Sequence, residues 1–527
     1  MISAHYFRLS ALALATAFAF PAQAAGEARN VIFFLGDGMG PTVVTAARIY
    51  KYGEAGLLTM DTLKRTARIK TYSLDAQTTD SAPSMAAYMT GVKTRNEVLS
   101  MDGTTTAYVP GTSTQYSQSA PVQGASSVSG ALNNCPASGN GSPSKTLLEY
   151  AIGAGKATGV VTTARLTHAT PAATYAHICN RNLEYDIARQ AVPGGAGFNP
   201  ALGAGVDVLL GGTSYFWRPY PYQTAADVLS STVNKGRLDG RNLVTEMQTA
   251  GYSFVSDRTG LLAAPTSGNA RLFGLFDQAD QFQNQGHMNY ELDRDPTQEP
   301  SLAEMTSKAI DVLAAKNKGY FLMVEGGRID HALHGTNAAR ALADTIAFDD
   351  AIKVALNKVD LSNTLIVVTA DHDHTMAFNG YSSKGNNILG KADNWQTPGV
   401  ADIVTPSDKL PYTTLVFGNG SGYAGIKGNL AASPLHMFNP FTQIVNGVGL
   451  GAPRAVNGAR IDLTAIDTTH KDYIQDYGVQ TSTSSPGGET HGGGDVMLFA
   501  KGVGSSGFKG TLDNTAVFGL LKSAFGF

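Results

Sequence analysis

Runs of consecutive apolar residues alternate with helix-like segments along most of the chain. Each run is short and rich in β-branched or aromatic residues, which is typical of strands. Strands without polar alternation are buried on both faces, as in parallel sheets covered by helices. Helices are predicted at 302–316 and 337–357. The pattern therefore predicts an α/β fold with a mainly parallel central sheet and helices on both of its faces. The apolar runs are 30–35, 159–164, 319–324 and 363–368.

Polar residues suited to catalysis or metal binding follow each of these predicted strands. In open α/β sheets, ligands bind beyond the carboxyl ends of the strands. We therefore expect the four polar groups to converge on one place. They are Asp37 after the first strand, His168 and Thr170 after the second, Glu325 and Asp330 after the third, and Asp371 and His372 after the fourth.

Two stretches interrupt the alternation of strands and helices. Residues 103–144 are rich in Gly, Ser, Thr, Pro and Asn, which predicts a long surface loop. Residues 376–487 are dense in Gly, Asn, Tyr and Pro, and we interpret them as an insertion that leaves the core and returns at His491. The two cysteines, Cys135 and Cys179, leave two alternatives, one disulfide or two unpaired thiols.

The first 24 residues have the layout of a secretory signal peptide. Arg8 precedes an apolar core from Leu9 to Phe20, and small residues up to Ala24 form a cleavage signal. This core is shorter than the roughly 20 residues needed to span a membrane. The pattern predicts a signal peptide at 1–24 and a mature catalytic domain at 25–527, exported to the periplasm or secreted.

The composition places limits on the partners of the protein. The chain has 527 residues, 43% hydrophobic and 15% charged, which is typical of a globular protein. A net charge of −3 argues against nucleic acid or an anionic membrane as the main partner. Any affinity for an anionic ligand such as phosphate must therefore come from local features.

Ser81 lies in TTDSAPSMAAYMTG at 78–91, just before an Ala- and Met-rich run that predicts a helix. Ser81 is either a helix cap alone or a nucleophile, because a helix N-terminus favours a bound anion. No G-x-S-x-G motif surrounds this serine, so activation by a metal is the better interpretation. The nearby carboxylates and imidazoles suit Zn²⁺, with an oxygen-only subset for Mg²⁺.

Six motifs together resemble the alkaline phosphatase family, and especially its animal-type branch. They occur in the order of that family from about residue 29 to 501, which makes the set far more specific than any one motif. The motifs are GDGMG, TTDSA with TGVKT, THATPAATYAH followed by NR, VEGGRIDHALH, TADHDH and ETHGGGD.

The resemblance implies a phosphate monoester hydrolase with two zinc ions, one magnesium ion and a phosphoserine intermediate, working at alkaline pH. Ser81 matches the nucleophile and Arg181 the residue that grips phosphate. His168 and His331 match positions that act through water on the magnesium or the phosphate. The implied metal ligands are Asp330, His334 and His491 for the first zinc, Asp371, His372 and Ser81 for the second, Thr170 and Glu325 for magnesium, and Asp37 bridging the second zinc and magnesium.

Some alternatives stay open. A sulfatase or phosphodiesterase of the same superfold is the nearest, although Met85 replaces the arginine of the sulfatase motif; a secreted zinc-binding protein without catalysis is another. The resemblance also implies a homodimer through a crown-like insertion and a calcium site that includes Asp277 and Glu299. His374 matches no metal ligand, and Asp80 either holds Arg181 or only shapes the turn.

Overall fold

The computed structural model describes most of the chain from residue 28 onward. The predicted signal peptide, much of the predicted surface loop and Asp277 lie outside the described residues. The described residues are 28–108, 135–136, 138–220, 222, 236–276, 286–396, 403–404, 409–421, 444–445, 448–449, 463–475, 477–482 and 489–527.

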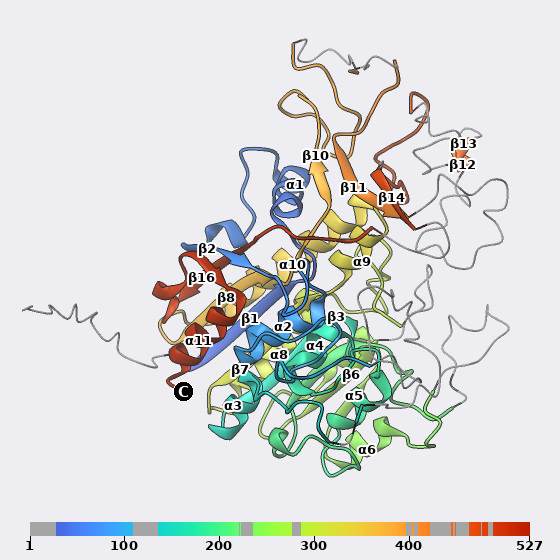
Figure 1. The fold of residues 1–527 in the computed structure, drawn as a ribbon. Helices are drawn as coiled ribbons and strands as arrows, with labels where there is room; N and C mark the ends of the chain where they lie inside the picture. Colours follow the sequence, from blue (N-terminus) through green and yellow to red (C-terminus); the bar gives the residue numbers. More distant parts are fainter. Residues whose placement is uncertain are drawn as a thin grey trace, which may run out of the picture.

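A ten-stranded sheet forms the centre of the fold, in the order β17-β2-β16-β8-β1-β7-β3-β4-β6-β5 (Figure 1). Neighbouring strands are parallel except around β16, which is antiparallel to both β8 and β2. The prediction of a mainly parallel sheet is confirmed. The strands are β1 Asn30–Gly36, β2 Arg65–Lys70, β3 Ala157–Arg165, β4 Val208–Gly212, β5 Ser253–Val255, β6 Leu272–Phe276, β7 Tyr320–Gly326, β8 Thr364–Ala370, β16 Val496–Gly502 and β17 Gly510–Asp513.

Helices cover the sheet in two groups. In one group α8 and α1 pack on α10, and in the other α4 and α11 pack on α2. The predicted helices at 302–316 and 337–357 correspond to α8 and α10. The first group is α1 Pro41–Tyr52, α8 Leu302–Ala314, α9 Arg328–His334 and α10 Ala338–Lys358; the second is α2 Ser81–Thr90, α3 Leu147–Gly153, α4 Ala169–Tyr175 and α11 Asn514–Phe525; α5 Glu184–Gln190, α6 Leu243–Thr249 and α7 Arg258–Ala263 complete the helices of the described residues.

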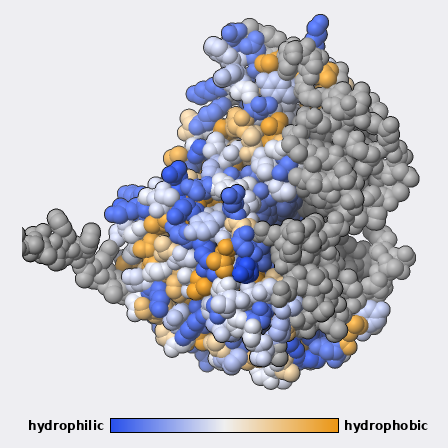
Figure 2. All heavy atoms as spheres, viewed as in Figure 1, coloured by the Kyte–Doolittle hydropathy of each residue, from blue (hydrophilic) through white to orange (hydrophobic). Residues whose placement is uncertain are grey.

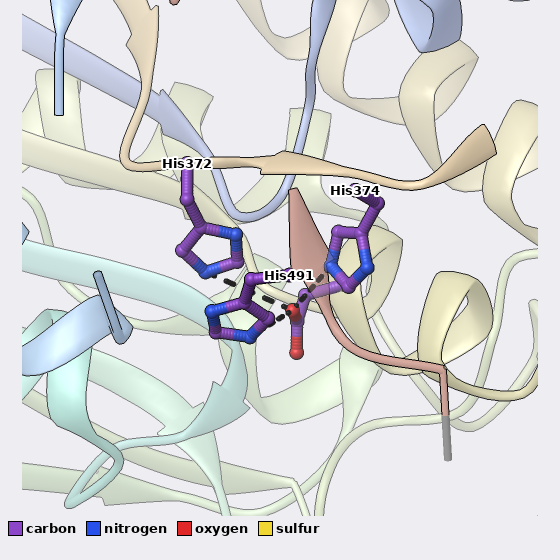
Figure 3. Close-up of side chains that lie close together, drawn as sticks. His372, His374 and His491 are labelled. Atoms are coloured by element: carbon purple, nitrogen blue, oxygen red, sulfur yellow. Dashed lines mark hydrogen bonds and ion pairs between the residues drawn. The ribbon is translucent and has the colours of Figure 1, made fainter. Parts of the chain in front are cut away.

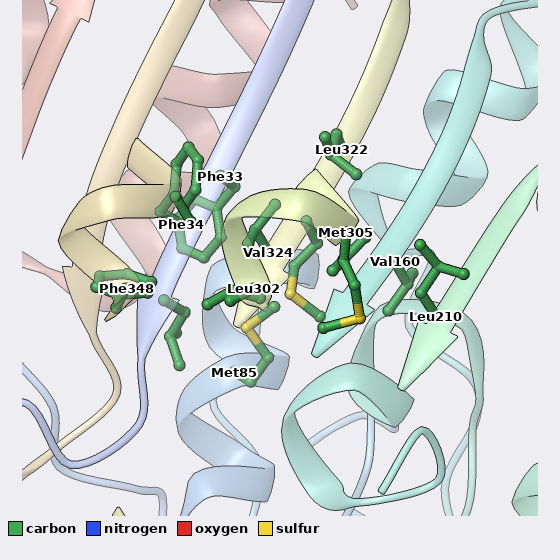
Figure 4. Close-up of a cluster of buried hydrophobic side chains, with 14 of the residues drawn as sticks. Phe33, Phe34, Met85, Val160, Leu210, Leu302, Met305, Leu322, Val324 and Phe348 are labelled. Atoms are coloured by element: carbon green, nitrogen blue, oxygen red, sulfur yellow. The ribbon is translucent and has the colours of Figure 1, made fainter. Parts of the chain in front are cut away.

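The hydrophobic core lies between the sheet and these helices. Phe33 and Phe34 are fully buried on β1, and the ring of Phe34 meets Phe348 of α10 edge to face with centroids 5.9 Å apart. Met85, on α2, is fully buried in the same core (Figure 4). Burial of each such side chain stabilises the fold by about 2 kcal/mol, so the strands that carry the polar groups have a rigid base.

The described part of the predicted insertion adds no strand to the ten-stranded sheet. It forms a separate three-stranded sheet, β10-β11-β14, which lies apart from the central sheet in Figure 1. At its two ends β9 pairs with β15, with His374 opposite His491. The strands are β9 Asp373–His374, β10 Met376–Phe378, β11 Leu415–Ser421, β12 Ile444–Val445, β13 Val448–Gly449, β14 Tyr477–Ser482 and β15 His491–Gly492.

Cys135 and Cys179 form a disulfide, which confirms the first of the two alternatives for the cysteines. Among the described residues, none of the helices is both long and apolar enough to cross a membrane. Hydrophilic and hydrophobic side chains are interspersed over the visible described surface (Figure 2).

Arg340 fastens the insertion to helix α10. Its guanidinium is fully buried and lies 2.6 Å from Asp293 and 2.5 Å from Asp472, and it also donates to the carbonyl of Lys471. A buried arginine of this kind is tolerated only because its charge is paired on two sides.

We expect Arg340→Ala to lower the free energy of unfolding by about 3–5 kcal/mol, because it leaves Asp293 and Asp472 buried without their main partner. Urea denaturation measures the loss. Arg258→Ala is the matched control, since it breaks a more exposed pair with Glu304 and is expected to change stability little. An equal effect of the two substitutions would contradict this role of Arg340.

Candidate active site

Acidic residues at the carboxyl ends of three central strands lie side by side at the same edge of the sheet. Leu35 of β1 pairs with Glu325 of β7, and Gly36 pairs with Ala370 of β8. Asp37 and Asp371, which follow these strands, are therefore neighbours, and the N–H of Gly38 donates to Asp371 Oδ1 at 3.0 Å. The predicted convergence of the strand ends is present in the structure.

Ser81 is the first residue of α2 and is buried at its N-terminus. Its Oγ lies 3.2 Å from His372 Nε2 and 3.4 Å from Asp37 Oδ1. The interpretation of Ser81 as the helix cap is wrong, because Asp80 occupies that position and accepts a hydrogen bond from the N–H of Ala82 at 2.7 Å. Asp80 has the short carboxylate favoured at an N-cap, which leaves the serine hydroxyl free to face the cluster.

Asp80 also holds Arg181, so both roles that the sequence left open for it are present. Arg181 Nη1 donates to Asp80 Oδ1 at 3.0 Å, and its Nη2 lies 3.1 Å from His168 Nε2. Burial lowers the pKa of Arg181, but the carboxylates of Asp80, Glu97 and Asp37 outweigh burial and hold it above the ordinary value. The guanidinium is therefore a permanent positive charge beside Ser81's helix.

Three histidines, His334, His372 and His491, have their Nε2 atoms near one carboxylate oxygen, as Figure 3 shows for His372 and His491. The Nδ1 of His334 is bonded to the carbonyl of Glu489, that of His491 to the carbonyl of Thr79 and that of His372 to the carbonyl of Asp373. This places the proton on Nδ1 and leaves the Nε2 lone pair free, as in metal-binding imidazoles. The Nε2 atoms of His334 and His491 face one another at 3.1 Å, which requires a proton or a cation between them.

Asp330 lies at the centre of these imidazoles. Its Oδ1 is 3.3 Å from the Nε2 of His334, 3.4 Å from that of His491 and 3.9 Å from that of His372. Asp330 and His334 come from the same short helix, α9, where residues four apart share a face. The sequence placed all four residues in the site, and the structure brings them together.

His374 is a site residue for which sequence analysis predicted no role. Its Nε2 lies 2.7 Å from Asp330 Oδ1, and its Nδ1 is bonded to the carboxylate of Glu489. Burial lowers the pKa of His374, but Glu489 and Asp330 outweigh it and raise that pKa well above the ordinary value. His374 is thus a charged donor that orients Asp330. The alternating Asp-His-Asp-His sequence is a signal that could have found it, since residues two apart in an extended segment share a side.

A second group combines Asp37, Glu325 and His168, whose ligand atoms all lie within 4.8 Å of one another. Glu325 accepts a hydrogen bond from Thr162, a residue that the sequence did not single out. Thr170 is buried on the adjoining helix α4. His331 lies behind His168, with ring centroids 5.3 Å apart, and packs against His287, which was also not predicted.

The cluster fits divalent cations. Within the described part of the chain, four of its buried oxygens have no hydrogen-bond partner: Asp37 Oδ2, Thr170 Oγ1, Glu325 Oε1 and Asp371 Oδ2. Buried polar atoms normally have a partner, because leaving one unpaired costs about 1–3 kcal/mol or more. Carboxylate and hydroxyl oxygens next to imidazoles with free lone pairs are the ligands that Mg²⁺ and Zn²⁺ prefer.

The described residues give no comparable support to the predicted calcium site. Both carboxylate oxygens of Glu299 accept hydrogen bonds from Asn289, at 2.9 Å from its N–H and 2.8 Å from Nδ2. With Asp277 outside the described residues, the calcium site stays a prediction.

The fold and the site define the class of protein. A buried serine at a helix N-terminus, a fixed arginine and a cation-binding cluster at the carboxyl edge of a parallel sheet are the parts of a metal-dependent enzyme of phosphoryl transfer. A sequence profile described as alkaline phosphatase matches residues 28–527. The chain therefore belongs to the alkaline phosphatase family and is an enzyme of that family.

Curated relatives support this assignment, and a solved structure is similar in fold. The chain is 33% identical to the tissue-nonspecific alkaline phosphatase of Felis catus over 90% of this chain and 79% of the relative. It is 34% identical to the alkaline phosphatase of Gadus morhua over 90% and 87%. The crystal structure of Thermus thermophilus alkaline phosphatase is similar in fold, with a TM-score of 0.60 at 24% identity, covering 95% of this chain and 92% of that one.

The acidic cluster predicts how stability depends on pH in the cation-free protein. Burial, with the neighbouring carboxylates, raises the pKa of Asp371 to about 7 and that of Glu325 to about 8. Both values exceed the value of about 4 expected for unfolded carboxyls, so the folded state binds these protons more tightly. The stability of chelator-treated protein should therefore fall as the pH rises, with the loss complete above about pH 8.

Urea midpoints of chelator-treated and cation-loaded protein between about pH 6.5 and 9 measure this effect, because ordinary histidines are already neutral over most of this range. Bound cations should remove the part of the loss that comes from Asp371 and Glu325. Glu325→Gln should also reduce it in chelator-treated protein. A midpoint independent of pH after chelation would show that these carboxyls are not perturbed.

Proposed function

We propose that the protein hydrolyses phosphate monoesters through a phosphoserine on Ser81 and releases inorganic phosphate at alkaline pH. The observation that carries the proposal is the position of Ser81 Oγ, 3.2 Å from His372 Nε2 and 3.4 Å from Asp37 Oδ1, at the edge of a cluster with four unpaired buried oxygens. This serine has no triad of its own, so the cluster is its means of activation.

The residues that would hold two zinc ions and one magnesium ion are those of the two groups described above. Asp330, His334 and His491 would hold one zinc, Asp371, His372 and Ser81 the second, and Thr170 and Glu325 the magnesium, with Asp37 shared. When bound, such ions lower the pKa of a coordinated hydroxyl and stabilise charge on the attacking and leaving oxygens.

The chain's own residues position the reaction. Ser81 Oγ loses its proton to solvent and attacks phosphorus, and the bond to the leaving alkoxide breaks; the alkoxide takes up a proton from water. Water then hydrolyses the phosphoserine and regenerates the hydroxyl. Arg181 presents a planar fork suited to two phosphate oxygens, and Asp80 fixes its direction. Positioning and charge neutralisation supply most of the rate enhancement in phosphoryl transfer.

The histidines are expected to set the acid limit of activity. Burial lowers the pKa of His334, His372 and His491, so each is neutral at the pH where the enzyme would work. A neutral imidazole is required for metal binding. The neutral state of these three imidazoles supports activity at alkaline pH.

A sulfatase is less well supported than a phosphatase. Met85, which stands where the sulfatase motif has arginine, is fully buried in the core beneath α2. An arginine side chain there would have to be buried in this apolar core. Hydrolysis of diesters stays an alternative, because the site grips a phosphoryl group without a recognisable pocket for the second ester group.

Replacing Ser81 by Ala should lower kcat/KM for an aryl phosphate monoester by at least about a thousandfold, because no other hydroxyl takes the place of the nucleophile. Zinc content should be largely retained. Thr90→Ala, at the other end of the same helix, is the matched control and should keep most of the activity. A panel with a diester and a sulfate ester separates the alternatives; a preference for either would overturn the proposal.

We also propose that the chain is exported, loses residues 1–24 and forms a homodimer through the crown-like insertion. The signal-peptide pattern and the separate sheet β10-β11-β14 support this. The exported protein should begin at Ala25, and light scattering should give twice the mass of one mature chain. An intact N-terminus or a monomer would contradict the corresponding part.

A further inference from the structure

Glu97 has a backbone conformation that an acidic residue rarely adopts. Its φ is +72°, in the left-handed region, and the N–H of Val98 bonds to the carbonyl of Arg95 to close the turn around it. The third position of such a turn favours glycine, because a side chain there carries a steric cost. An acidic side chain at this position needs a compensating contact.

The backbone and the carboxylate of Glu97 bond to Arg181, the proposed phosphate-binding residue, or to residues that adjoin it in space or in sequence. Its carbonyl accepts a hydrogen bond from the N–H of Arg181 at 2.7 Å, and its own N–H donates to Asp80 Oδ2. Its carboxylate accepts from Asn182 Nδ2 at 3.0 Å. Arg181 is thus held between two turns that each supply a carboxylate.

The carboxylate of Glu97 is not needed to hold Arg181 in position. Asp80 already accepts from the guanidinium at 3.0 Å, and the backbone of Glu97 would bind Arg181 whatever its side chain. What the side chain adds is a negative charge on a residue bonded to both Arg181 and Asn182, and this charge contributes to the raised pKa of Arg181. A charge there opposes the approach of a phosphate dianion to the same guanidinium.

We propose that Glu97 is a positioning residue that weakens the hold of Arg181 on phosphate, and so limits inhibition by the product. The inference rests on the proposed monoester hydrolysis, whose product is inorganic phosphate. Burial and the carboxylate of Asp80 raise the pKa of Glu97 to about 7, while Arg181 lowers it, so Glu97 is ionised at alkaline pH. The opposing charge is therefore present where the enzyme would work.

The test compares metal-loaded wild type with Glu97→Gln and Glu97→Gly at pH 9. Glutamine keeps an acceptor for Asn182 but removes the charge, and glycine also removes the backbone strain. Both variants should lower the Ki for inorganic phosphate and the KM for an aryl phosphate monoester by about three- to tenfold, as expected for one nearby charge at a high effective dielectric. The value of kcat should not rise.

Ser100→Gly is the matched control, because Ser100 is the other left-handed residue of this loop, with φ +47°, and carries no charge. The Ki of this variant for inorganic phosphate should stay within about twofold of the wild-type value. This difference corresponds to a smaller free-energy change than the removal of one charge contact. A Ki for Glu97→Gln equal to or higher than that of the wild type would overturn the proposal, since Glu97 would then only support the loop.

Calorimetric titration with inorganic phosphate keeps this test separate from the proposed function. If the wild type hydrolysed no phosphate monoester, the proposed function would be refuted. Tighter binding of phosphate by Glu97→Gln would still support the role of Glu97, and unchanged binding would refute it.

Discussion

Repulsion among buried carboxylates at the end of the central sheet is the constraint on which the rest of the site depends. Burial and the charges of Asp330 and Glu325 raise the pKa of Asp37 well above its ordinary value. Paired parallel strands fix Glu325 beside Leu35 and Ala370 beside Gly36, so these acids cannot move apart without breaking the sheet. A fold that places like charges so rigidly is stable only when positive charge is brought to them.

The chain brings part of that positive charge from distant segments. Arg181 is held by Asp80, which also caps the helix that begins with Ser81. His374, charged between Glu489 and Asp330, offsets one of the acids directly. Four buried oxygens of the cluster have no hydrogen-bond partner in the chain, and a bound cation is the remaining means of satisfying them.

The parts of this arrangement that follow local rules could be predicted from the sequence. Apolar runs predicted the strands, and the residues just after them, such as Asp37 and Asp371, predicted the site. Arg181 is far in sequence from any such strand end, and only the resemblance to a family placed it in the site. His287 and Glu489 were missed because their contacts depend on tertiary packing; His374 and Glu489 are 115 residues apart. The cap at Asp80 was misassigned by one residue because serine and aspartate are both good caps.

The attachment of the insertion explains how one chain combines a rigid site with a second, separate sheet. The insertion begins and ends at the site, where His374 and His491 pair across β9 and β15. Further along, the N–H of Glu489 bonds to the carbonyl of His334, and the N–H of Gln475 to that of Thr336. These backbone bonds need no particular side chain in the insertion. Together with the buried ion pair between Arg340 and Asp472, they fix the insertion to the core, so the imidazoles keep the positions that the chemistry requires.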